Sequence, residues 1–584
     1  MWQTSIRIAL LPRRPRCRRS LPPALSKQSA FARVLPLATT LASAGLLVWL
    51  ALPTVWWTPL NVDEELTIRV SDFSFANVFD IVSTKRGGGP LHFWLEQVLL
   101  GWWPSLASLR LPSLVFICLA LPAVALIARR LIGDEGSAGV VLLTAASPIP
   151  VLYATFGRPH TLLFAWIMWS TLLALHAAER GDRRLWIAAG AALGLSVFVH
   201  PTAPLYAGTA LLAALLYAPR DPRTVWREAW PGLIAFAVTF GPYYVRTLHV
   251  LGDRYGVSSS AASGRTFSGQ PVWEDARHFI APGSHNLNYF TVLAVIGLVA
   301  LLVQRRYRIV GVCVLTVAAP IVFFSVVPAS GDSALFFDRY MIPAIPAFLI
   351  LVLAGVLALA RFTALVRFAA PLRLLVIATL VGWLLVQELH YDLRHRDHTR
   401  AIGIEAVAHA AARQPAGSVL FGSTGTSGAL FSSFDYGHPA NLLDRYIALS
   451  THSLQFVDDD SCERALPFRQ STQTPRYGIW LFYAVASDEQ RAAAAAFART
   501  RAVVVRPGPQ YFLLRSPDRL APEALIRLGR SYRLAWRAAV PSNPRVNELL
   551  IADRELLNGR CIPYGDLGDP DISPHWPPAR TTHQ

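Results

Sequence analysis

The chain alternates between long apolar runs and short polar connections. Its first two thirds contain about eleven apolar runs of about 16 to 26 residues, the length at which a helix crosses a hydrocarbon core of about 30 Å. Several runs are short, so we expect some helices to be tilted or broken. The pattern predicts a polytopic α-helical membrane protein. The runs lie near residues 33–57, 106–131, 137–156, 160–178, 185–200, 202–218, 230–248, 289–304, 309–328, 340–360 and 372–390.

The last third of the chain, residues 391–584, has the shorter periodicities of a soluble domain. The segments AIGIEAVAHAAAR, SDEQRAAAAAFART and PEALIRLGRSYRLAW have helical periodicity. The segments GSVLFGS, YGIWLFYA and RAVVVRPGPQYFLLRSP are typical of strands, and Pro507-Gly508-Pro509 predicts a hairpin in the last of them. About 190 residues suffice for a domain with its own core, so we expect one α/β domain here.

Composition and charge agree with a membrane protein. Of the 584 residues, 53% are hydrophobic and only 16% are charged, against about 25% charged in a typical soluble protein. The net charge is +17, but the basic residues stand in short connections such as ARRLIGDEG and QRRYR, which alternate with longer connections of mixed charge. This is the positive-inside pattern of a membrane protein. We therefore predict a lipid bilayer as the partner of this chain, and no nucleic acid.

The same asymmetry predicts the topology and the domains. Residues 1–32 form a basic arm that we place in the cytoplasm, and residues 33–390 form the transmembrane domain of a multi-pass cell-membrane protein. Eleven spans then place residues 391–584 outside the cytoplasm. The first external loop, residues 58–105, is the most informative connection.

Three consecutive acids, Asp63, Glu64 and Glu65, stand where that loop leaves the first span. Residues 64–82 place their apolar side chains on one stripe, which predicts a helix lying flat on the membrane. The segment PLHFWLEQVLLGWW predicts a second helix, which is interfacial or re-entrant. Glu64 and Glu65 would then favour the helix dipole, and Asp63 could cap the helix. The alternative is that an acid at the outer face acts in catalysis.

Cationic side chains occur in loops on the same predicted side. They are Lys85, Arg86, Arg158 and Arg339. Lys and Arg at a membrane boundary often only extend their charged ends into water.

The order of these motifs resembles the membrane glycosyltransferases of the GT-C class, similar to protein O-mannosyltransferases and aminoarabinose lipid A transferases. The resemblance runs from the acids through PLHFWLEQVLLGWW, LRLPS and YATFGRPHTL to DRYMIPAIPAFLIL, and covers about residues 33 to 390. It implies inverting transfer of a sugar from a polyprenyl-phosphate donor to an envelope acceptor, which is a glycan, lipid or protein.

The resemblance also implies roles for individual residues. Asp63, with Glu64 next, would be the catalytic carboxylate. The four cations would bind the donor phosphate, and His92, His160 and Tyr340 would bind substrate. The chain departs from the family at His160, where a tyrosine is usual, and at Gly88-Gly89-Pro90. These departures affect the acceptor class rather than the fold.

Two other classes of function remain open. A transporter or flippase would place ionisable residues near the middle of its spans and often shows repeats, and neither feature is present in this sequence. An envelope assembly protein without transferase activity is the other. We predict no metal site, because the spacing of Glu274, Asp275 and His278 matches no strong ligand pattern, although a divalent metal cofactor stays possible.

Two of the five cysteines, Cys462 and Cys561, fall in the soluble tail. An oxidising compartment favours pairing of such thiols, and both stand in loop-like sequence. We therefore predict a disulfide between them, with two buried free thiols as the alternative.

Overall fold

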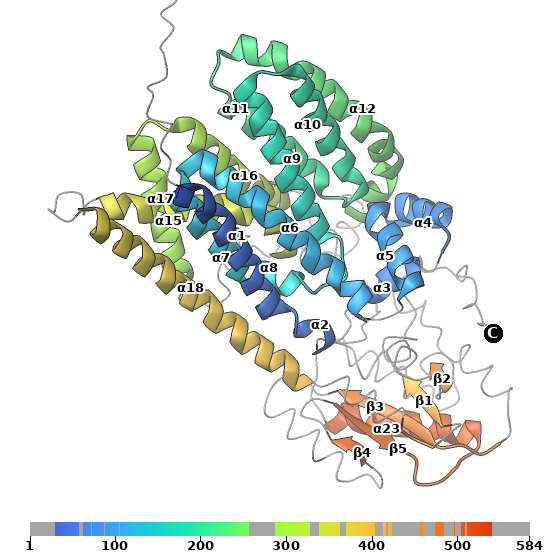
Figure 1. Cartoon of the computed structure of the whole chain (residues 1–584). Helices are drawn as coiled ribbons and strands as arrows, with labels where there is room; N and C mark the ends of the chain where they lie inside the picture. The colour runs from blue at the N-terminus through green and yellow to red at the C-terminus, as the bar shows by residue number, and fades with distance from the viewer. Residues whose placement is uncertain are drawn as a thin grey trace, which may run out of the picture.

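The computed structural model describes residues 30–57, 62–71, 73–86, 88–103, 106–255, 286–326, 338–361, 369–402, 413–415, 418–422, 455–458, 474–483, 496, 504–507 and 511–539. The described chain forms a large helical bundle with a small sheet at one end (Figure 1).

Each of the eleven predicted apolar segments coincides with a helix or with a broken pair of helices. The helices are α1 (Ala30–Ala51), α2 (Thr54–Trp57), α6 (Leu106–Ile132), α7 (Asp134–Ala146), α8 (Pro148–Tyr153), α9 (His160–Arg180), α10 (Arg183–Leu195), η3 (Ser196–Phe198), α11 (Ala203–Tyr217), α12 (Pro222–Tyr255), α15 (Asn286–Val303), α16 (Tyr307–Val326), η4 (Asp338–Ala344), α17 (Ile345–Arg361) and α18 (Ala369–Ile402). The break between α7 and α8 falls at Ser147-Pro148, because proline has no amide hydrogen to continue the helical bonding.

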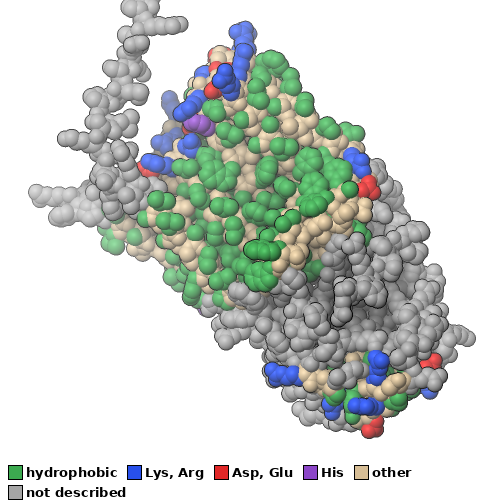
Figure 2. Space-filling model, turned by 45° about the vertical axis from the view of Figure 1, so that its right-hand side comes forward, with side chains coloured by type: hydrophobic (Ala, Val, Ile, Leu, Met, Phe, Trp, Pro, Cys, Tyr) green, Lys and Arg blue, Asp and Glu red, His purple; other side chains and the backbone are tan. Residues whose placement is uncertain are grey.

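Among the described residues, four helical segments are both long and apolar enough to cross a membrane. They are Ala107–Ile132, His160–Arg180, Tyr340–Arg361 and Leu372–His390. Other apolar helices in the described part are shorter, such as Ala203–Tyr217. Figure 2 shows hydrophobic side chains spread over the visible face of the bundle. These features are those of an integral membrane protein, whereas the number of spans stays a prediction.

The first external loop folds into several short helices, of which the last matches the helix predicted from PLHFWLEQVLLGWW. They are α3 (Val62–Ser71), α4 (Phe75–Ile81), the π-helical turn η2 (Val82–Arg86) and α5 (Pro90–Trp102). The single helix predicted over residues 64–82 is therefore wrong. The Ser74 side chain accepts a hydrogen bond from the Asn77 amide and begins α4 anew. Val70, Val78, Val82 and Phe93 pack these helices into a small core of their own.

The C-terminal part contains a five-stranded mixed sheet in the order β2-β1-β3-β5-β4. Its strands are β1 (Val419–Gly422), β2 (Gln455–Asp458), β3 (Gly478–Tyr483), β4 (Val504–Pro507) and β5 (Tyr511–Arg515), and helix α23 (Pro522–Ala539) packs on β3. Strands β1 and β2 are parallel, whereas β5 pairs antiparallel with β3 and β4. Trp480 of β3 meets Tyr532 of α23 edge to face at 5.3 Å.

The two ends of the bundle differ in character. Figure 1 places the short helices α2 to α5 and the sheet at the same end. Figure 2 shows one group of Lys and Arg side chains at the end of the bundle away from the sheet and another around the sheet itself. Helix α6, which begins beside the acidic loop, ends with Arg129 and Arg130, and α9 ends with Arg180. The acidic loop and the basic connections therefore lie at opposite ends. Which end faces the cytoplasm stays a prediction from the positive-inside rule.

Candidate functional site

A buried ion pair joins the acidic loop to the bundle. Arg110, in the first turns of α6, donates through Nε and Nη2 to the two carboxylate oxygens of Glu64, at 2.8 and 2.7 Å. Glu64 is 1% exposed and Arg110 is fully buried. A third guanidinium nitrogen donates to the carbonyl of Val55 at 2.8 Å. This bidentate geometry fixes the first turn of α3, in which Asp63 directly precedes Glu64.

The turn between α8 and α9 lies against the same ion pair. The amide of Gly157 donates to Glu64 Oε1 at 2.8 Å, and His92 Nε2 lies 3.2 Å from the Gly157 carbonyl oxygen. The Ser113 hydroxyl of α6 donates to the Phe156 carbonyl at 2.6 Å. Side chains from α3, α5 and α6 therefore hold this one turn.

Gly157 allows this close approach. A Cβ atom at that position would stand 2.5 Å from Leu109 Cγ and 3.1 Å from the Leu109 carbonyl oxygen. No side chain fits in that space without moving the start of α6. The glycine in FGRPH is therefore explained by packing, and it brings the amide of residue 157 within reach of Glu64.

Arg158 is the next residue in the turn and is half-buried. Its Nη1 lies 3.4 Å from the Thr67 hydroxyl, which stands one helical turn after Glu64 in α3. Arg158 and the acidic start of α3 are therefore neighbours. The structure brings together a predicted catalytic region and a predicted phosphate-binding cation that lie more than ninety residues apart in sequence.

His92 and Glu96 lie one turn apart in α5, behind the same turn. His92 is 1% exposed and Glu96 is fully buried. Burial, followed by the charge of Arg158, lowers the pKa of His92 to about 3, although its bond to Gly157 opposes this shift. Burial, together with the charge of Glu64, raises the pKa of Glu96 to about 9. Within the protein, His92 Nε2 lies against the Gly157 carbonyl oxygen. The substrate-binding role predicted for His92 stays a prediction.

An aromatic cluster forms around His160, two residues after Arg158. The ring centroid of His160 lies 5.0 Å from that of His200 and 6.0 Å from that of Tyr340, and the His200 and Tyr340 centroids are 5.7 Å apart. The Thr202 amide donates to His200 Nδ1 at 3.1 Å, which closes a local turn just before α11 begins at Ala203. The structure thus brings His160 and Tyr340 together, as two predicted substrate-binding residues require.

The segment that carries Lys85 and Arg86 is fastened to α12. Arg246 of α12 donates to the Ser83 hydroxyl at 2.8 Å and to Asp80 Oδ1 at 2.7 Å, and the Tyr243 hydroxyl donates to the Gly88 carbonyl at 2.5 Å. A Cβ atom at Gly89 would collide with the backbone of Phe198 and Val199. The glycine at position 89 therefore has a packing reason.

Several predicted residues are not placed. The backbones of Asp63, Lys85, Arg86 and Arg339 lie in α3, η2 and η4, but their side chains lie outside the described part of the structure, as do Cys462 and Cys561. Glu274, Asp275 and His278 also lie outside it. Within the described residues, no group of three or more His, Cys, Asp or Glu side chains is arranged to hold a metal ion. The disulfide and the four roles stay predictions.

Sequence reasoning missed Arg110, Gly157 and Glu96. Arg110 had a usable signal, because it stands alone in the apolar run LASLRLPSLVFICLALP. A charged residue inside such a run needs a partner, and the nearest acids in sequence are those of the first loop. The partners of Gly157 come from segments far away in sequence and carried no comparable signal, whereas Glu96 stands one helical turn after His92 in the same helix.

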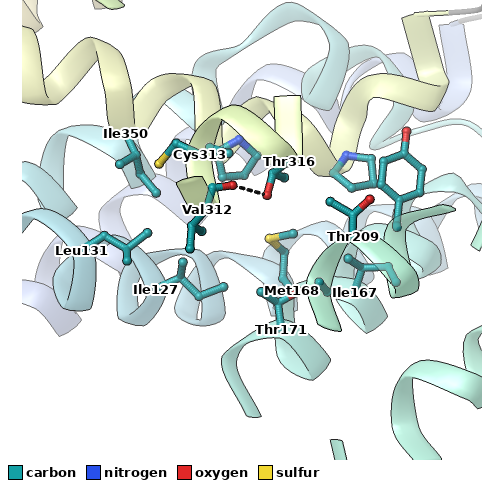
Figure 3. A pocket seen from close by; sticks show the side chains of 15 residues that line it. Ile127, Leu131, Ile167, Met168, Thr171, Thr209, Val312, Cys313, Thr316 and Ile350 are labelled. Atoms are coloured by element: carbon teal, nitrogen blue, oxygen red, sulfur yellow. Dashed lines mark hydrogen bonds between the residues drawn. The ribbon is translucent and has the colours of Figure 1, made fainter. Parts of the chain in front are cut away.

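An apolar cavity lies within the bundle (Figure 3). Side chains of α6, α9, α11, α16 and α17 line it, including Ile127, Met168, Thr209 and Cys313. The Thr316 hydroxyl donates to the Val312 carbonyl in its wall at 2.8 Å. The described residues that line it include no Asp, Glu, Lys, Arg or His. The lining of this cavity offers nothing for acid–base chemistry, which leaves the first loop as the candidate site.

Comparison with known proteins gives one family match. Residues 88–243 match the family model described as dolichyl-phosphate-mannose-protein mannosyltransferase. This segment includes α5, the turn that carries Gly157 and Arg158, and Tyr243. The predicted resemblance to the mannosyltransferases of the GT-C class is confirmed over these residues. A search of curated proteins finds no match.

Three solved structures, two of them of the same protein, are similar to this chain. ArnT from Cupriavidus metallidurans in the apo state has a TM-score of 0.49 and 15% identity, with 83% of this chain and 97% of that chain covered. The same protein bound to undecaprenyl phosphate has a TM-score of 0.46 and 14% identity, with 83% and 98% covered. The apo oligosaccharyltransferase of Archaeoglobus fulgidus has a TM-score of 0.44 and 12% identity, with 80% and 71% covered.

Proposed function

We propose that this protein transfers a sugar from a polyprenyl-phosphate donor to an envelope acceptor, at the membrane face where α3 and α5 lie. One observation carries the proposal: the Glu64–Arg110 pair and the Gly157 amide hold the acidic start of α3 against the turn that carries Arg158. A carboxylate and a cation are the two groups that this reaction needs. The matched family is described by a dolichyl-phosphate donor, which belongs to the same chemical class.

The reaction proceeds in one displacement with inversion. The oxygen of an acceptor hydroxyl attacks the anomeric carbon, and a new carbon–oxygen bond forms as the bond to the phosphate oxygen breaks. The hydroxyl proton passes to the Asp63 carboxylate, and the lipid phosphate leaves with the bonding electron pair. General-base help of this kind contributes about 10²- to 10⁴-fold in rate.

The two adjacent acids have different roles in this proposal. The Glu64 carboxylate accepts hydrogen bonds from Arg110 and from the Gly157 amide, so it holds α3 in place rather than taking a proton. The general base is therefore Asp63. Arg158 stabilises the charge that develops on the leaving phosphate, and Lys85, Arg86 and Arg339 add to the same positive field. His160 and Tyr340 provide the ring surface on which a sugar packs. The mass spectrometry described next identifies the sugar and the acceptor.

Mass spectrometry of lipids and envelope glycans tests the function in cells. Cells that lack this protein are compared with cells that carry it on a plasmid. We expect a polyprenyl-phosphate sugar to accumulate and one envelope glycan to lose a residue. Unchanged lipids and glycans would contradict the proposal. A donor that accumulates only in the cytoplasmic leaflet would instead indicate a flippase.

A further inference from the structure

Glu96 is a buried carboxyl group that the proposed reaction does not use. It is fully buried in α5, and neither of its oxygens has a hydrogen-bond partner. His92 Nδ1 lies 3.9 Å from Oε1, and that nitrogen also has no hydrogen-bond partner. A buried polar group without a partner is costly, so two of them side by side call for an explanation.

The hydrogen bond on the far side of the His92 ring fixes the position of its proton. The Gly157 carbonyl oxygen can only accept, so Nε2, at 3.2 Å, carries the hydrogen. In the neutral ring, Nδ1 is then a bare acceptor that faces Glu96. An acceptor is satisfied by a donor, and a carboxyl group donates only when it is protonated.

The electrostatic surroundings favour the protonated carboxyl group. The charged group that acts on Glu96 is Glu64 of α3, which repels a second carboxylate and is itself paired with Arg110 of α6. Burial, followed by the charge of Arg158, lowers the pKa of His92 and keeps its ring neutral. Asp80 of the neighbouring helix α4 is 61% exposed and is paired with Arg246, and it does not contribute to the shifted pKa of Glu96. Burial and Glu64 together raise the pKa of Glu96 to about 9.

We propose that Glu96 is a neutral carboxylic acid that donates to His92 Nδ1, and that this pair positions the Gly157–Arg158 turn for catalysis. The turn is then held from two directions. Glu64 accepts from the Gly157 amide, and His92 donates to the Gly157 carbonyl. The catalytic part of this inference rests on the proposed function, whereas the protonation of Glu96 does not.

The pair has a consequence for pH. In the unfolded chain a glutamate ionises at about its ordinary pKa of 4.5, whereas in the folded protein it keeps its proton up to a pH of about 9. The folded state therefore binds one more proton between these values, so stability from this group is complete below about 4.5 and is lost as pH rises through about 9. Above that pH a second carboxylate would lie beside Glu64, and the turn would shift.

Four variants of the full-length protein, Glu96→Gln, Glu96→Leu, His92→Gln and His92→Ala, separate the possible roles of Glu96. Glu96→Gln keeps the shape and keeps a donor, but it cannot ionise. Glu96→Leu keeps the volume and loses the donor. His92→Gln keeps a donor near the Nε2 position. Each is purified in detergent, and thermal unfolding is followed by tryptophan fluorescence from pH 7 to pH 10. Turnover is measured with the polyprenyl-phosphate sugar that accumulates in cells lacking the protein.

We expect Glu96→Gln to match the wild type in turnover and unfolding midpoint at pH 7, and to lose less of both at pH 10. Glu96→Leu should lose about 10- to 100-fold in turnover at pH 7, as expected for a displaced catalytic turn. His92→Gln should retain more turnover than His92→Ala. If Glu96→Gln falls as far as Glu96→Leu at pH 7, the carboxylate itself is required and the proposal is wrong.

Two further outcomes would also overturn it. A Glu96→Leu variant equal to the wild type would reduce Glu96 to a space-filling role. Equal pH dependence of the unfolding midpoint in wild type and Glu96→Gln would show that Glu96 does not hold its proton. The unfolding measurement needs no substrate, so it tests the neutral acid even if the chain transfers no sugar. Failure of turnover in the wild type would contradict only the proposed function.

Discussion

Arg110 holds both carboxylate oxygens of Glu64 inside the protein, and neither side chain is more than 1% exposed. Removing one partner of such a pair leaves an unpaired buried charge, which typically costs about 3 to 5 kcal/mol of stability. We expect Glu64→Leu and Arg110→Met each to lower the free energy of unfolding by that amount, measured by denaturant unfolding in detergent.

The double variant is the control for this pair. Replacing both charges by apolar groups of similar size is often nearly neutral, so Glu64→Leu/Arg110→Met should regain most of the lost stability. It should not regain turnover, because the Gly157 amide has lost its acceptor. Single variants as stable as the wild type would show that the pair does not hold α3 to α6.

Gly157 lies where the chain has no room for a side chain. Gly157→Ala places a methyl group 2.5 Å from Leu109 Cγ, so we expect it to displace the turn and reduce turnover by at least about tenfold. Gly241→Ala in α12 is the matched control, since a Cβ atom there meets nothing within 4 Å. It should keep full turnover. Equal turnover of the two variants would remove the turn from the site.

Arg158 should act mainly on the donor. A hydrogen bond to a charged group contributes about 1.5 to 3 kcal/mol, so Arg158→Gln should lower kcat/KM for the lipid donor by about 10- to 150-fold. Arg158→Lys keeps the charge and should retain part of the activity. Arg183→Gln, an exposed arginine at the opposite end of the bundle, serves as the control. A donor kcat/KM that is unchanged in Arg158→Gln would exclude Arg158 from phosphate binding.

Much of the helical fold is predictable from the sequence, because apolar runs of spanning length have few alternatives. Helix α9 begins at His160 and α17 ends at Arg361, both within a few residues of the predicted limits. The first loop was harder. Val70 and Val78 of the predicted stripe do pack together, but the Ser74 side chain accepts from the Asn77 amide and begins a new helix within residues 64–82.

The site was predicted as a set of motifs and not as an arrangement. The sequence indicates that FGRPH, the acids and the PLHFWLEQ helix belong to one site, and the structure brings His92, Arg158 and Glu64 around Gly157. Nothing in the spacing tells that Glu64 faces inward to Arg110, because that depends on the rotation of α3 about its axis. Tertiary packing decides this rotation, and here it separates the roles of two adjacent acids.

His92 predicts how stability responds to acid. The folded protein keeps this ring neutral, since its pKa is lowered from 6.5 to about 3, whereas the unfolded chain binds a proton at about pH 6.5. The contribution of His92 is therefore complete above about 6.5 and is lost as pH falls toward 3. We expect thermal unfolding midpoints between pH 7 and pH 4 to fall more steeply in the wild type than in His92→Gln. Parallel curves would show that the ring is not buried as a neutral group.

The central claim is that Asp63 takes the proton of the acceptor. The direct test is turnover of purified wild type, Asp63→Asn and Glu65→Gln, with the donor that accumulates in cells lacking the protein and with an envelope extract from those cells as acceptor. Release of polyprenyl phosphate is measured at saturating donor. We predict that Asp63→Asn loses about 10²- to 10⁴-fold in kcat while its unfolding midpoint is unchanged, and that Glu65→Gln stays near the wild type. Wild-type turnover by Asp63→Asn would contradict the account.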